Sequence, residues 1–204
     1  MIADDHTLVA EAYRGILEPE NEVVATVADG RTLLQQAPTL FPELIILDLA
    51  MPLLNGLDAI LQIRHKLPNT KIVVVSMNKD PQLVAEAFRR GASAYIPKTS
   101  PPPELLQAVR EVLNGRSYLS PSATKETIGS LLRQQPTESE GLTDRQREVV
   151  QLIAEGKSMK ETAALMNTTI RTVSFHKYRV MKKLGLNSSA ELVQYAMRNH
   201  IIGA

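Results

Sequence analysis

The sequence predicts two domains of different classes. The first, over residues 1–115, is an α/β domain with a doubly wound parallel sheet of five strands, and the second, over residues 142–204, is a separate all-α domain of four helices. Two observations indicate this division. Short apolar runs alternate with helical segments in the first half, as expected for parallel strands covered by helices. After a stretch with weak periodicity at residues 116–141, which contains Pro, Gly and paired Gln, only helical spacing remains.

Apolar runs in the first half predict the strands of the sheet. The clearest runs cover residues 22–27, 44–47, 72–75 and 94–96, and residues 1–3 leave room for a further strand of only about 10 Å. Helical segments lie near residues 7–17, 31–37, 57–67, 81–90 and 103–113. Asp80 before Pro81 is a helix cap followed by proline at the first helical position, and Gly91 stops the same helix.

Composition excludes several classes of protein. The chain has no cysteine, which excludes a disulfide framework, a thiolate metal site and a cysteine nucleophile. No apolar stretch approaches the ~20 residues needed to cross a bilayer, and the first residues lack the basic and apolar regions of a signal peptide. We therefore expect a cytoplasmic protein with no membrane partner.

Charge divides the chain close to the predicted domain boundary. Residues 1–115 hold 10 Lys and Arg against 14 Asp and Glu, a net charge of −4, whereas residues 116–204 hold 13 against 8, a net charge of +5. A basic half that follows an acidic one makes the second domain the candidate for binding nucleic acid.

Polar side chains follow separate strands of the predicted sheet at the points where those strands end. They are Asp4 and Asp5 near the start, Asp48 after residues 44–47, Ser76 after residues 72–75 and Lys98 after residues 94–96. Because ligands bind outside the carboxyl ends of parallel strands, we expect these side chains to meet at one edge of the sheet. Taken singly, each has an ordinary explanation as a polar loop or a solvated strand end.

Three carboxylates at one edge repel one another unless a cation neutralises them. Mg²⁺ prefers oxygen ligands and usually shares its coordination shell with a phosphate. A carboxylate beside Mg²⁺ can attack phosphorus and form an acyl phosphate. Lys98 would then pair with one phosphoryl oxygen and Ser76 would donate a hydrogen bond to another. The group therefore predicts magnesium-dependent phosphoryl chemistry at this edge of the sheet.

With these residues in this order, and with Leu49-Ala50-Met51-Pro52 and Gly56 after Asp48, residues 1 to about 114 resemble the receiver domain of bacterial response regulators. The resemblance implies that a sensor histidine kinase phosphorylates Asp48. It implies further that Asp4, Asp5, Asp48 and the backbone carbonyl of Ala50 hold Mg²⁺, and that Ser76 and Tyr95 relay the switch. From the residues alone, Tyr95 is equally a half-buried strand aromatic.

Three features depart from the receiver pattern. The first strand is short, with only three residues before Asp4. Met77 stands where a small residue is usual and would restrict access to the site. Pro97 removes one hydrogen-bond donor from its strand, which an edge strand tolerates.

The second half contains four predicted helices. Capping boxes mark three starts, at Thr143 with Gln146, at Ser158 with Glu161 and at Ser188 with Glu191. A fourth helix begins around Thr169 and ends near Leu184, separated from its predecessor by only Asn167-Thr168. Such close succession is typical of a helix-turn-helix inside a small bundle. One more helix is expected before this domain, at residues 123–133.

The helix from Thr169 to Leu184 carries five basic and no acidic residues. At about 100° per residue, Val173, Val180 and Leu184 line one face, with His176 and Lys177 at its flanks. The opposite face holds Arg171, Ser174, Phe175, Tyr178 and Lys182. On charge alone, a surface helix whose aromatics pack on a neighbour explains this composition equally well.

Four segments of the second half are similar to a LuxR-type DNA-binding domain, and the match covers about residues 142–202. They are Leu142-Thr143-Asp144-Arg145-Gln146-Arg147-Glu148-Val149, Gly156-Lys157-Ser158-Met159-Lys160-Glu161, Thr172-Val173-Ser174-Phe175-His176-Lys177 and Lys183-Leu184-Gly185-Leu186. After a receiver, this domain identifies the whole chain as a member of the NarL/FixJ class of DNA-binding response regulators.

That resemblance implies which residues contact double-stranded DNA and which pair two copies of the chain. Ser174, Phe175 and Tyr178 would read bases in the major groove, and Lys160, Thr172, Lys177, Arg179 and Lys182 would contact phosphates. Part of the apolar stripe of the last helix, Leu192, Val193, Ala196 and Met197, would form a homodimer on DNA, although core packing alone explains the same residues.

The favoured function is a transcription regulator controlled by phosphorylation, with no enzymatic activity beyond phosphotransfer to its own Asp48 and autodephosphorylation. One alternative is a regulator that binds DNA without phosphorylation, because the short first strand has spoiled the acidic site. Another is an aspartyl-phosphate enzyme of the haloacid dehalogenase kind. That family requires a second Asp two residues after its nucleophile, where this chain has Ala50.

Overall fold

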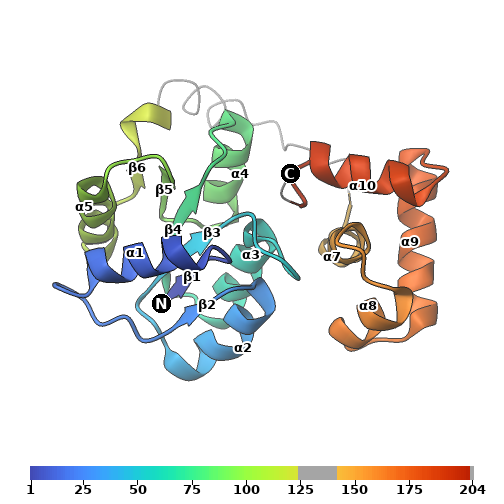
Figure 1. Cartoon of the computed structure of the whole chain (residues 1–204), viewed down its shortest axis with the longest axis horizontal. Helices are drawn as coiled ribbons and strands as arrows, with labels where there is room; N and C mark the ends of the chain where they lie inside the picture. Colours follow the sequence, from blue (N-terminus) through green and yellow to red (C-terminus); the bar gives the residue numbers. More distant parts are fainter. Residues whose placement is uncertain (124–141, 203–204) are drawn as a thin grey trace.

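The computed structural model describes residues 1–123 and 142–202. These residues form two domains that lie side by side, an α/β domain around a parallel sheet and a wholly helical domain (Figure 1). The two predicted domain classes are therefore confirmed. The predicted helix at residues 123–133 falls almost entirely outside the described residues, and its first residue, Ala123, ends a short 3-10 helix, Pro121–Ala123.

The sheet of the first domain has six parallel strands in the order β2-β1-β3-β4-β5-β6. Their bounds are β1 (Ile2–Ala3), β2 (Thr26–Val27), β3 (Leu44–Asp48), β4 (Lys71–Ser76), β5 (Ala94–Pro97) and β6 (Tyr118–Leu119). The prediction of five strands is corrected by β6, which lies in the segment expected to be a linker. Two backbone bonds, Tyr118 N to Ser93 O and Ser120 N to Tyr95 O, attach β6 to β5, and main-chain pairing of this kind leaves no apolar pattern in a two-residue strand.

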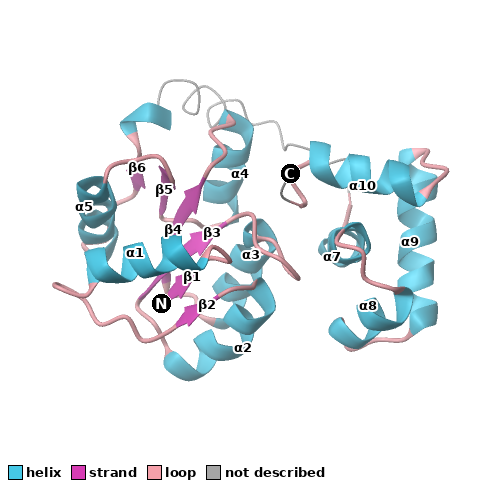
Figure 2. Ribbon diagram, in the orientation of Figure 1, coloured by secondary structure: helices cyan, strands magenta, loops and turns pink. Residues whose placement is uncertain are grey.

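Helices cover both faces of the sheet, as Figure 2 shows. On one face, α1 (Thr7–Leu17) and α5 (Pro102–Leu113) pack against Ile46, Val73 and Val75. On the other, α2 (Gly30–Leu40), α3 (Gly56–Lys66) and α4 (Pro81–Arg90) pack against Ile45, Leu47, Ile72 and Val74. Successive strand residues point to opposite faces, so an unbroken apolar run fills two cores at once.

Two details of the strands differ from expectation. The run at residues 22–27 forms a strand only at Thr26 and Val27, because β1 offers just two residues for pairing. Pro97 does not lie on an edge strand, because β5 has β4 on one side and β6 on the other. The structure tolerates this proline because β6 pairs only with Ala94 and Tyr95 and stops before Pro97 is reached.

The second domain consists of α7 (Asp144–Ala154), α8 (Met159–Leu165), α9 (Ile170–Leu184) and α10 (Ser189–Arg198). Reciprocal capping boxes are present at Thr143 and Ser158, as predicted. The third box is corrected: Ser188 accepts from Glu191 N, but the Glu191 carboxylate accepts from Asn187 N instead of closing the box. Across residues 1–123 and 142–202, no helix combines the length and apolarity that spanning a membrane requires.

Gly56, the first residue of α3, touches the end of β3. A Cβ added there would lie 2.4 Å from Asp48 O and 2.7 Å from Leu49 Cα, closer than real Cβ contacts. We expect Gly56→Ala to lower the free energy of unfolding by about 1–3 kcal/mol, since the clash is with backbone. Gly15→Ala in α1, where nothing lies within 4 Å, is the matched control and should be stabilising. Urea unfolding of both variants measures the difference, and equal stabilities would contradict the close approach.

Candidate functional site

The carboxyl edge of the sheet gathers the side chains that the strand ends predict. Asp4 follows β1, Asp48 and Ser76 are the last residues of β3 and β4, and Lys98 follows β5. Asp4 and Asp48 are 2% and 1% exposed, so their charges depend on a neighbour. Lys98 Nζ lies 2.7 Å from Asp4 Oδ2 and 2.8 Å from Asp48 Oδ2. The ammonium therefore bridges two buried carboxylates that would otherwise repel each other.

The buried carboxylate and the ammonium shift each other's titration. Burial raises the pKa of Asp48 above its ordinary value, and the hydrogen bond from Lys98 only partly offsets this. Burial by itself lowers the pKa of Lys98, but hydrogen bonds to Asp4 and Asp48 outweigh it, so the pKa of Lys98 is raised. The lysine is thus held as a cation next to the carboxylate that it stabilises.

A cluster of possible metal ligands surrounds this pair. One oxygen or nitrogen atom from each of Asp4, Asp5, His6 and Asp48 lies within 4.8 Å of the others. His6 was not predicted; its Nδ1 lies 2.8 Å from Asp5 Oδ1, and its place next to Asp4-Asp5 in the sequence was the available signal. Asp4 Oδ2 is buried and ion-paired with Lys98, and a carboxylate oxygen in one such contact keeps a further lone pair. Three carboxylates with a spare oxygen lone pair fit a hard cation such as Mg²⁺.

Ser76 and Tyr95 meet at the loop after β4. Ser76 Oγ accepts a hydrogen bond from Asn78 N at 3.2 Å, and the Tyr95 hydroxyl donates to Asn78 O at 2.7 Å. Tyr95 is fully buried, more than the half-burial expected of it as a strand aromatic. Burial raises the pKa of Tyr95 to about 12, so the hydroxyl remains a donor. Met77 beside it is 68% exposed and points away from the core.

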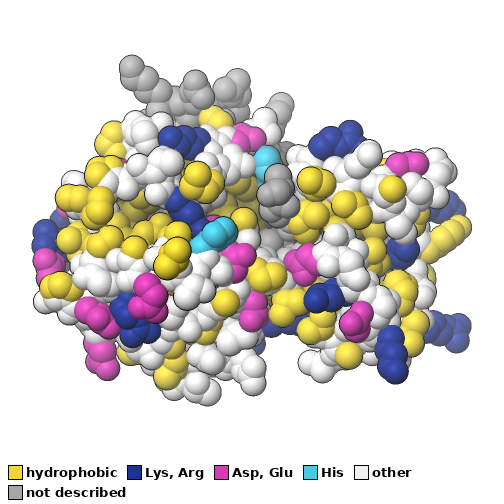
Figure 3. Space-filling model, in the orientation of Figure 1, with side chains coloured by type: hydrophobic (Ala, Val, Ile, Leu, Met, Phe, Trp, Pro, Cys, Tyr) yellow, Lys and Arg dark blue, Asp and Glu magenta, His cyan; other side chains and the backbone are white. Residues whose placement is uncertain are grey.

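The basic helix α9 presents the predicted faces. Val173 and Val180 are fully buried, whereas Phe175 and Tyr178 are 53% and 66% exposed. Arg179 lies over the Phe175 ring, 5.4 Å from its centroid, which holds a cation beside the exposed aromatic. Lys and Arg side chains stand along the outer side of the helical domain in Figure 3, away from the sheet domain.

The other predicted DNA contacts are also at the surface. Ser174, Lys160, Arg179 and Lys182 are exposed, and Thr172 is half-buried. Lys177 is half-buried, and its Nζ donates to Ser189 Oγ of α10 at 3.0 Å. A contact between this lysine and a DNA phosphate would compete with that hydrogen bond.

The predicted dimer residues of α10 divide into two groups. Leu192 and Ala196 are fully buried in the core of their own domain, where they pack with Val150 and Val180. Only Val193, which is half-buried, and Met197, which is 44% exposed, have surface left for a partner. The apolar stripe of this helix is thus explained mainly by the core.

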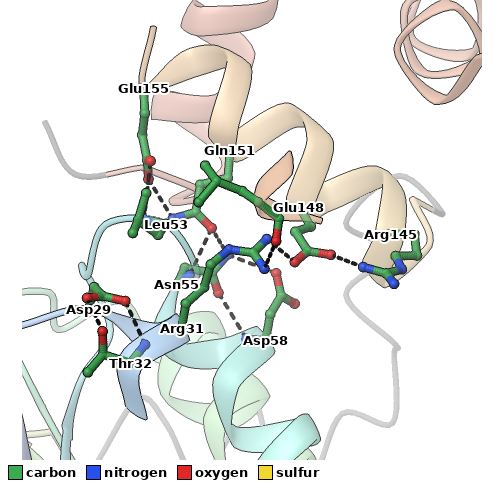
Figure 4. A network of polar contacts seen from close by, with 11 residues as sticks. Asp29, Arg31, Thr32, Leu53, Asn55, Asp58, Arg145, Glu148, Gln151 and Glu155 are labelled. Atoms are coloured by element: carbon green, nitrogen blue, oxygen red, sulfur yellow. Dashed lines mark hydrogen bonds and ion pairs between the residues drawn. The ribbon is translucent and has the colours of Figure 1, made fainter. Parts of the chain in front are cut away.

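The opposite net charges of the two halves make a contact between the domains plausible, and Figure 4 shows one, formed by polar residues that were not predicted. The Gln151 side chain of α7 donates to Met51 O at 3.1 Å and accepts from Asn55 N at 2.8 Å. Glu155 accepts from Leu53 N at 3.1 Å. All three receiver partners lie in the loop that follows Asp48, so backbone groups next to the buried carboxylate hold α7.

Charged side chains extend this contact on the side of α2 and α3. Arg31 pairs with Glu148 of α7, as Figure 4 shows. Its guanidinium also donates to Leu165 O at 2.6 Å. Arg147 Nε lies 3.5 Å from Asp58 Oδ1 of α3, a buried carboxylate. A single sequence carries little sign of such pairs, apart from Gln151, a polar residue between Val150 and Leu152 in an apolar stretch.

A buried Asp held by Lys at the carboxyl edge of a doubly wound sheet, joined to a helix-turn-helix with an exposed basic helix, defines a DNA-binding response regulator. Residues 1–110 match the response regulator receiver domain, and residues 140–196 match the luxR family of bacterial regulatory proteins. The chain belongs to the response regulators that combine a receiver domain with a LuxR-type DNA-binding domain.

Similar proteins support the same assignment over nearly the whole chain. The oxygen regulatory protein NreC of Staphylococcus aureus (strain JH9) is 35% identical over 212 residues, which cover 99% of this chain and 98% of NreC. RcsB from Salmonella enterica serovar Typhimurium, bound to promoter P1flhDC in the presence of phosphomimetic BeF3-, is 28% identical with a TM-score of 0.62, covering 97% of this chain and 96% of RcsB.

These findings confirm the predicted family, fold class and function as a DNA-binding response regulator. The family consists of transcription regulators, so the alternative of a haloacid dehalogenase enzyme is not supported. Receiver domains generally bind Mg²⁺ through an acidic cluster, and this chain has such a cluster at Asp4, Asp5 and Asp48.

The bridge formed by Lys98 generates a prediction for stability. Lys98→Met removes the cation between two buried carboxylates and should lower the free energy of unfolding by about 3–5 kcal/mol without metal. Millimolar Mg²⁺ should recover more stability in this variant than in the wild type, because the metal takes over the neutralisation. Lys66→Met, at an exposed lysine of α3, is the control and should change stability by no more than about 0.5 kcal/mol. Thermal unfolding with and without Mg²⁺ measures both; an unchanged midpoint for Lys98→Met would contradict the bridge.

Proposed function

We propose that a sensor histidine kinase phosphorylates Asp48 and that the phosphorylated chain regulates transcription. One observation carries the proposal: the Asp48 carboxylate is buried, held by Lys98, and lines a cavity with Asp5 and Ser76. Lys98 would pair with a phosphoryl oxygen, and Ser76 would donate a hydrogen bond to another. The chemistry of the chain itself would be limited to this phosphotransfer and to autodephosphorylation. The chain would act in the cytoplasm, because it would meet both the kinase and DNA there.

Asp4, Asp5 and Asp48, together with the backbone carbonyl of Ala50, would hold Mg²⁺. When bound, the metal would neutralise the negative charge that the phosphodonor and the carboxylates share. The three carboxylates differ in their surroundings. Asp4 is ion-paired with Lys98, Asp5 is exposed to solvent, and Asp48 Oδ1 accepts a hydrogen bond from Ala50 N at 3.3 Å.

The effect of phosphorylation would be transmitted to the helical domain by Ser76 and Tyr95 and by the loop after Asp48. In the docked arrangement α9 keeps Phe175 and Tyr178 exposed, so the receiver does not cover the base-reading face. Before phosphorylation, the receiver would therefore restrain DNA binding by holding the helical domain in a fixed position, not by covering α9. Phosphorylation would favour a homodimer on DNA through Val193 and Met197 of α10. Structures of RcsB dimers bound to DNA support this mode of binding.

The same exposed face favours a second candidate function, DNA binding that does not depend on phosphorylation. Full-length protein should bind its preferred site more tightly after treatment with a phosphodonor if the first function holds. Equal affinity before and after treatment would favour the second.

The phosphoacceptor role predicts the outcome of chemical labelling. With Mg²⁺ and acetyl phosphate, the wild type should gain one phosphoryl group, because Asp48 is the carboxylate that joins the buried strand β3 to Lys98 and to the Asp4-Asp5 pair. Asp48→Asn should gain none, and Asp5→Ala should lose labelling because the metal is lost. Lys98→Ala should retain some labelling but show no coupling to DNA binding. Intact-mass spectrometry measures each variant, and equal labelling of Asp48→Asn would sink the proposal.

The division of α9 into base readers and phosphate contacts predicts two kinds of loss. Lys182→Ala should weaken binding to every sequence and reduce the salt slope by about 0.9, the value of one phosphate contact. Phe175→Ala and Tyr178→Ala should cost about 1–3 kcal/mol on the preferred site, with little effect on random DNA. Binding curves on specific and scrambled duplexes across a salt series decide. Equal losses of binding free energy on specific and scrambled duplexes would show that the two aromatic residues contribute to DNA affinity without reading the sequence.

A further inference from the structure

The cavity over Asp48 is built by both domains. It has a volume of about 900 Å³, and the receiver contributes Asp5, Asp48 and Lys98 to its lining. The helical domain contributes Glu155 from the end of α7 and Met197, His200 and Ile202 from the end of the chain. The phosphoacceptor pocket is therefore closed on one side by residues that belong to the DNA-binding domain.

The residues on this side are held in place. His200 Nδ1 accepts from Asn78 Nδ2 at 3.2 Å, and His200 Nε2 lies 3.9 Å from Asp80 Oδ2. The backbone carbonyl of the same Asn78 accepts the hydrogen bond from the Tyr95 hydroxyl. At the opposite side of the cavity, Glu155 is fixed by its bonds to Leu53 N. The residues that the helical domain contributes to the cavity are therefore hydrogen-bonded to the loops after both β3 and β4.

The size of the opening distinguishes two kinds of phosphodonor. Small-molecule sites in proteins occupy about 300–1,000 Å³, so a compound such as phosphoramidate fits this cavity. A folded protein that carries phosphohistidine needs about 800 Å² of contact on each partner for a specific complex. Glu155, Met197 and His200 occupy the part of the surface around Asp48 that lies beside the loops after β3 and β4, so this part is not free for a second protein in the docked chain.

We propose that the docked DNA-binding domain selects the phosphodonor: small donors reach Asp48 in the docked chain, whereas a phosphohistidine protein reaches it only after the domains separate. In either case an Asp48 oxygen attacks phosphorus, and the bond from phosphorus to the leaving nitrogen breaks with its electron pair on that nitrogen. Both donors react in their protonated forms: phosphoramidate carries the proton on its nitrogen and releases ammonia, and phosphohistidine carries it on the other ring nitrogen and releases neutral imidazole. This inference rests on the proposed role of Asp48.

Charge reversal at one interdomain ion pair tests the proposal in the full chain. Arg31→Glu places two carboxylates together and should separate the domains, while a Glu in the first turn of α2 remains favourable for that helix. The double variant Arg31→Glu with Glu148→Arg restores opposite charges and should restore docking. Gln151→Ala, which removes the bonds to Met51 O and Asn55 N, is an independent undocking variant.

The measurement is the initial rate of phosphorylation with Mg²⁺ by phosphoramidate and by a histidine-phosphotransfer domain carrying phosphohistidine. The undocking variants should accept phosphate from the protein donor about tenfold faster than the wild type and the charge-swapped variant, as expected if about a tenth of the wild type is undocked. Rates with phosphoramidate should agree within about twofold for all of them, which also shows that the variants fold.

The outcomes separate this inference from the proposed function. If phosphoramidate labels the wild type but not Asp48→Asn, and neither undocking variant speeds transfer from the protein donor, the selection is overturned while the phosphoacceptor role stands. If phosphoramidate labels Asp48→Asn as well as the wild type, the proposed function fails, and the inference falls with it. A faster transfer from the protein donor in Gln151→Ala, or in Arg31→Glu with the wild-type rate restored by the charge swap, supports the selection.

Discussion

The contact of Lys98 with Asp4 and Asp48 is the interaction on which the receiver site depends. Two carboxylates at the carboxyl ends of β1 and β3 are almost completely buried, and each would be strongly disfavoured as an anion without a partner. The parallel sheet brings the end of β5 to the same edge, so Lys98 reaches both at 2.7 Å and 2.8 Å. The proposed metal binding and phosphorylation would both change the charge that this bridge neutralises.

The loop after Asp48 links that edge to the DNA-binding domain. Met51 O, Leu53 N and Asn55 N are backbone groups, and they bond to Gln151 and Glu155 of α7. A buried backbone group that loses its partner costs about 1–3 kcal/mol, so a shift of this loop changes the docking free energy directly. We propose that these three bonds, which we call the interdomain clasp, couple changes at Asp48 to α7 while Phe175 and Tyr178 of α9 stay exposed.

Much of the receiver site could be predicted from the sequence, because strand ends fix position. Asp48 and Lys98 follow apolar runs, and a parallel sheet must bring such ends together. The strand β6 could not be predicted, since two residues held by backbone bonds have no periodicity. The dimer assignment of Leu192 and Ala196 was ambiguous for a related reason: an apolar stripe identifies a buried face but not what buries it. The opposite net charges of the two halves indicated a contact between the domains, but of its residues only Gln151, in apolar surroundings, was marked by the sequence.

Amide hydrogen exchange at Leu53 and Asn55 tests the central claim most directly, because these two groups donate to Glu155 and Gln151. Exchange would be followed by NMR in the full chain, with and without Mg²⁺ and beryllofluoride as a phosphoryl mimic, in the wild type and in Asp48→Asn. If the clasp couples Asp48 to the DNA-binding domain, both amides exchange faster when the mimic is bound to the wild type and are unchanged in Asp48→Asn. Unchanged exchange in a wild-type protein whose Asp48 carries the mimic would contradict the account.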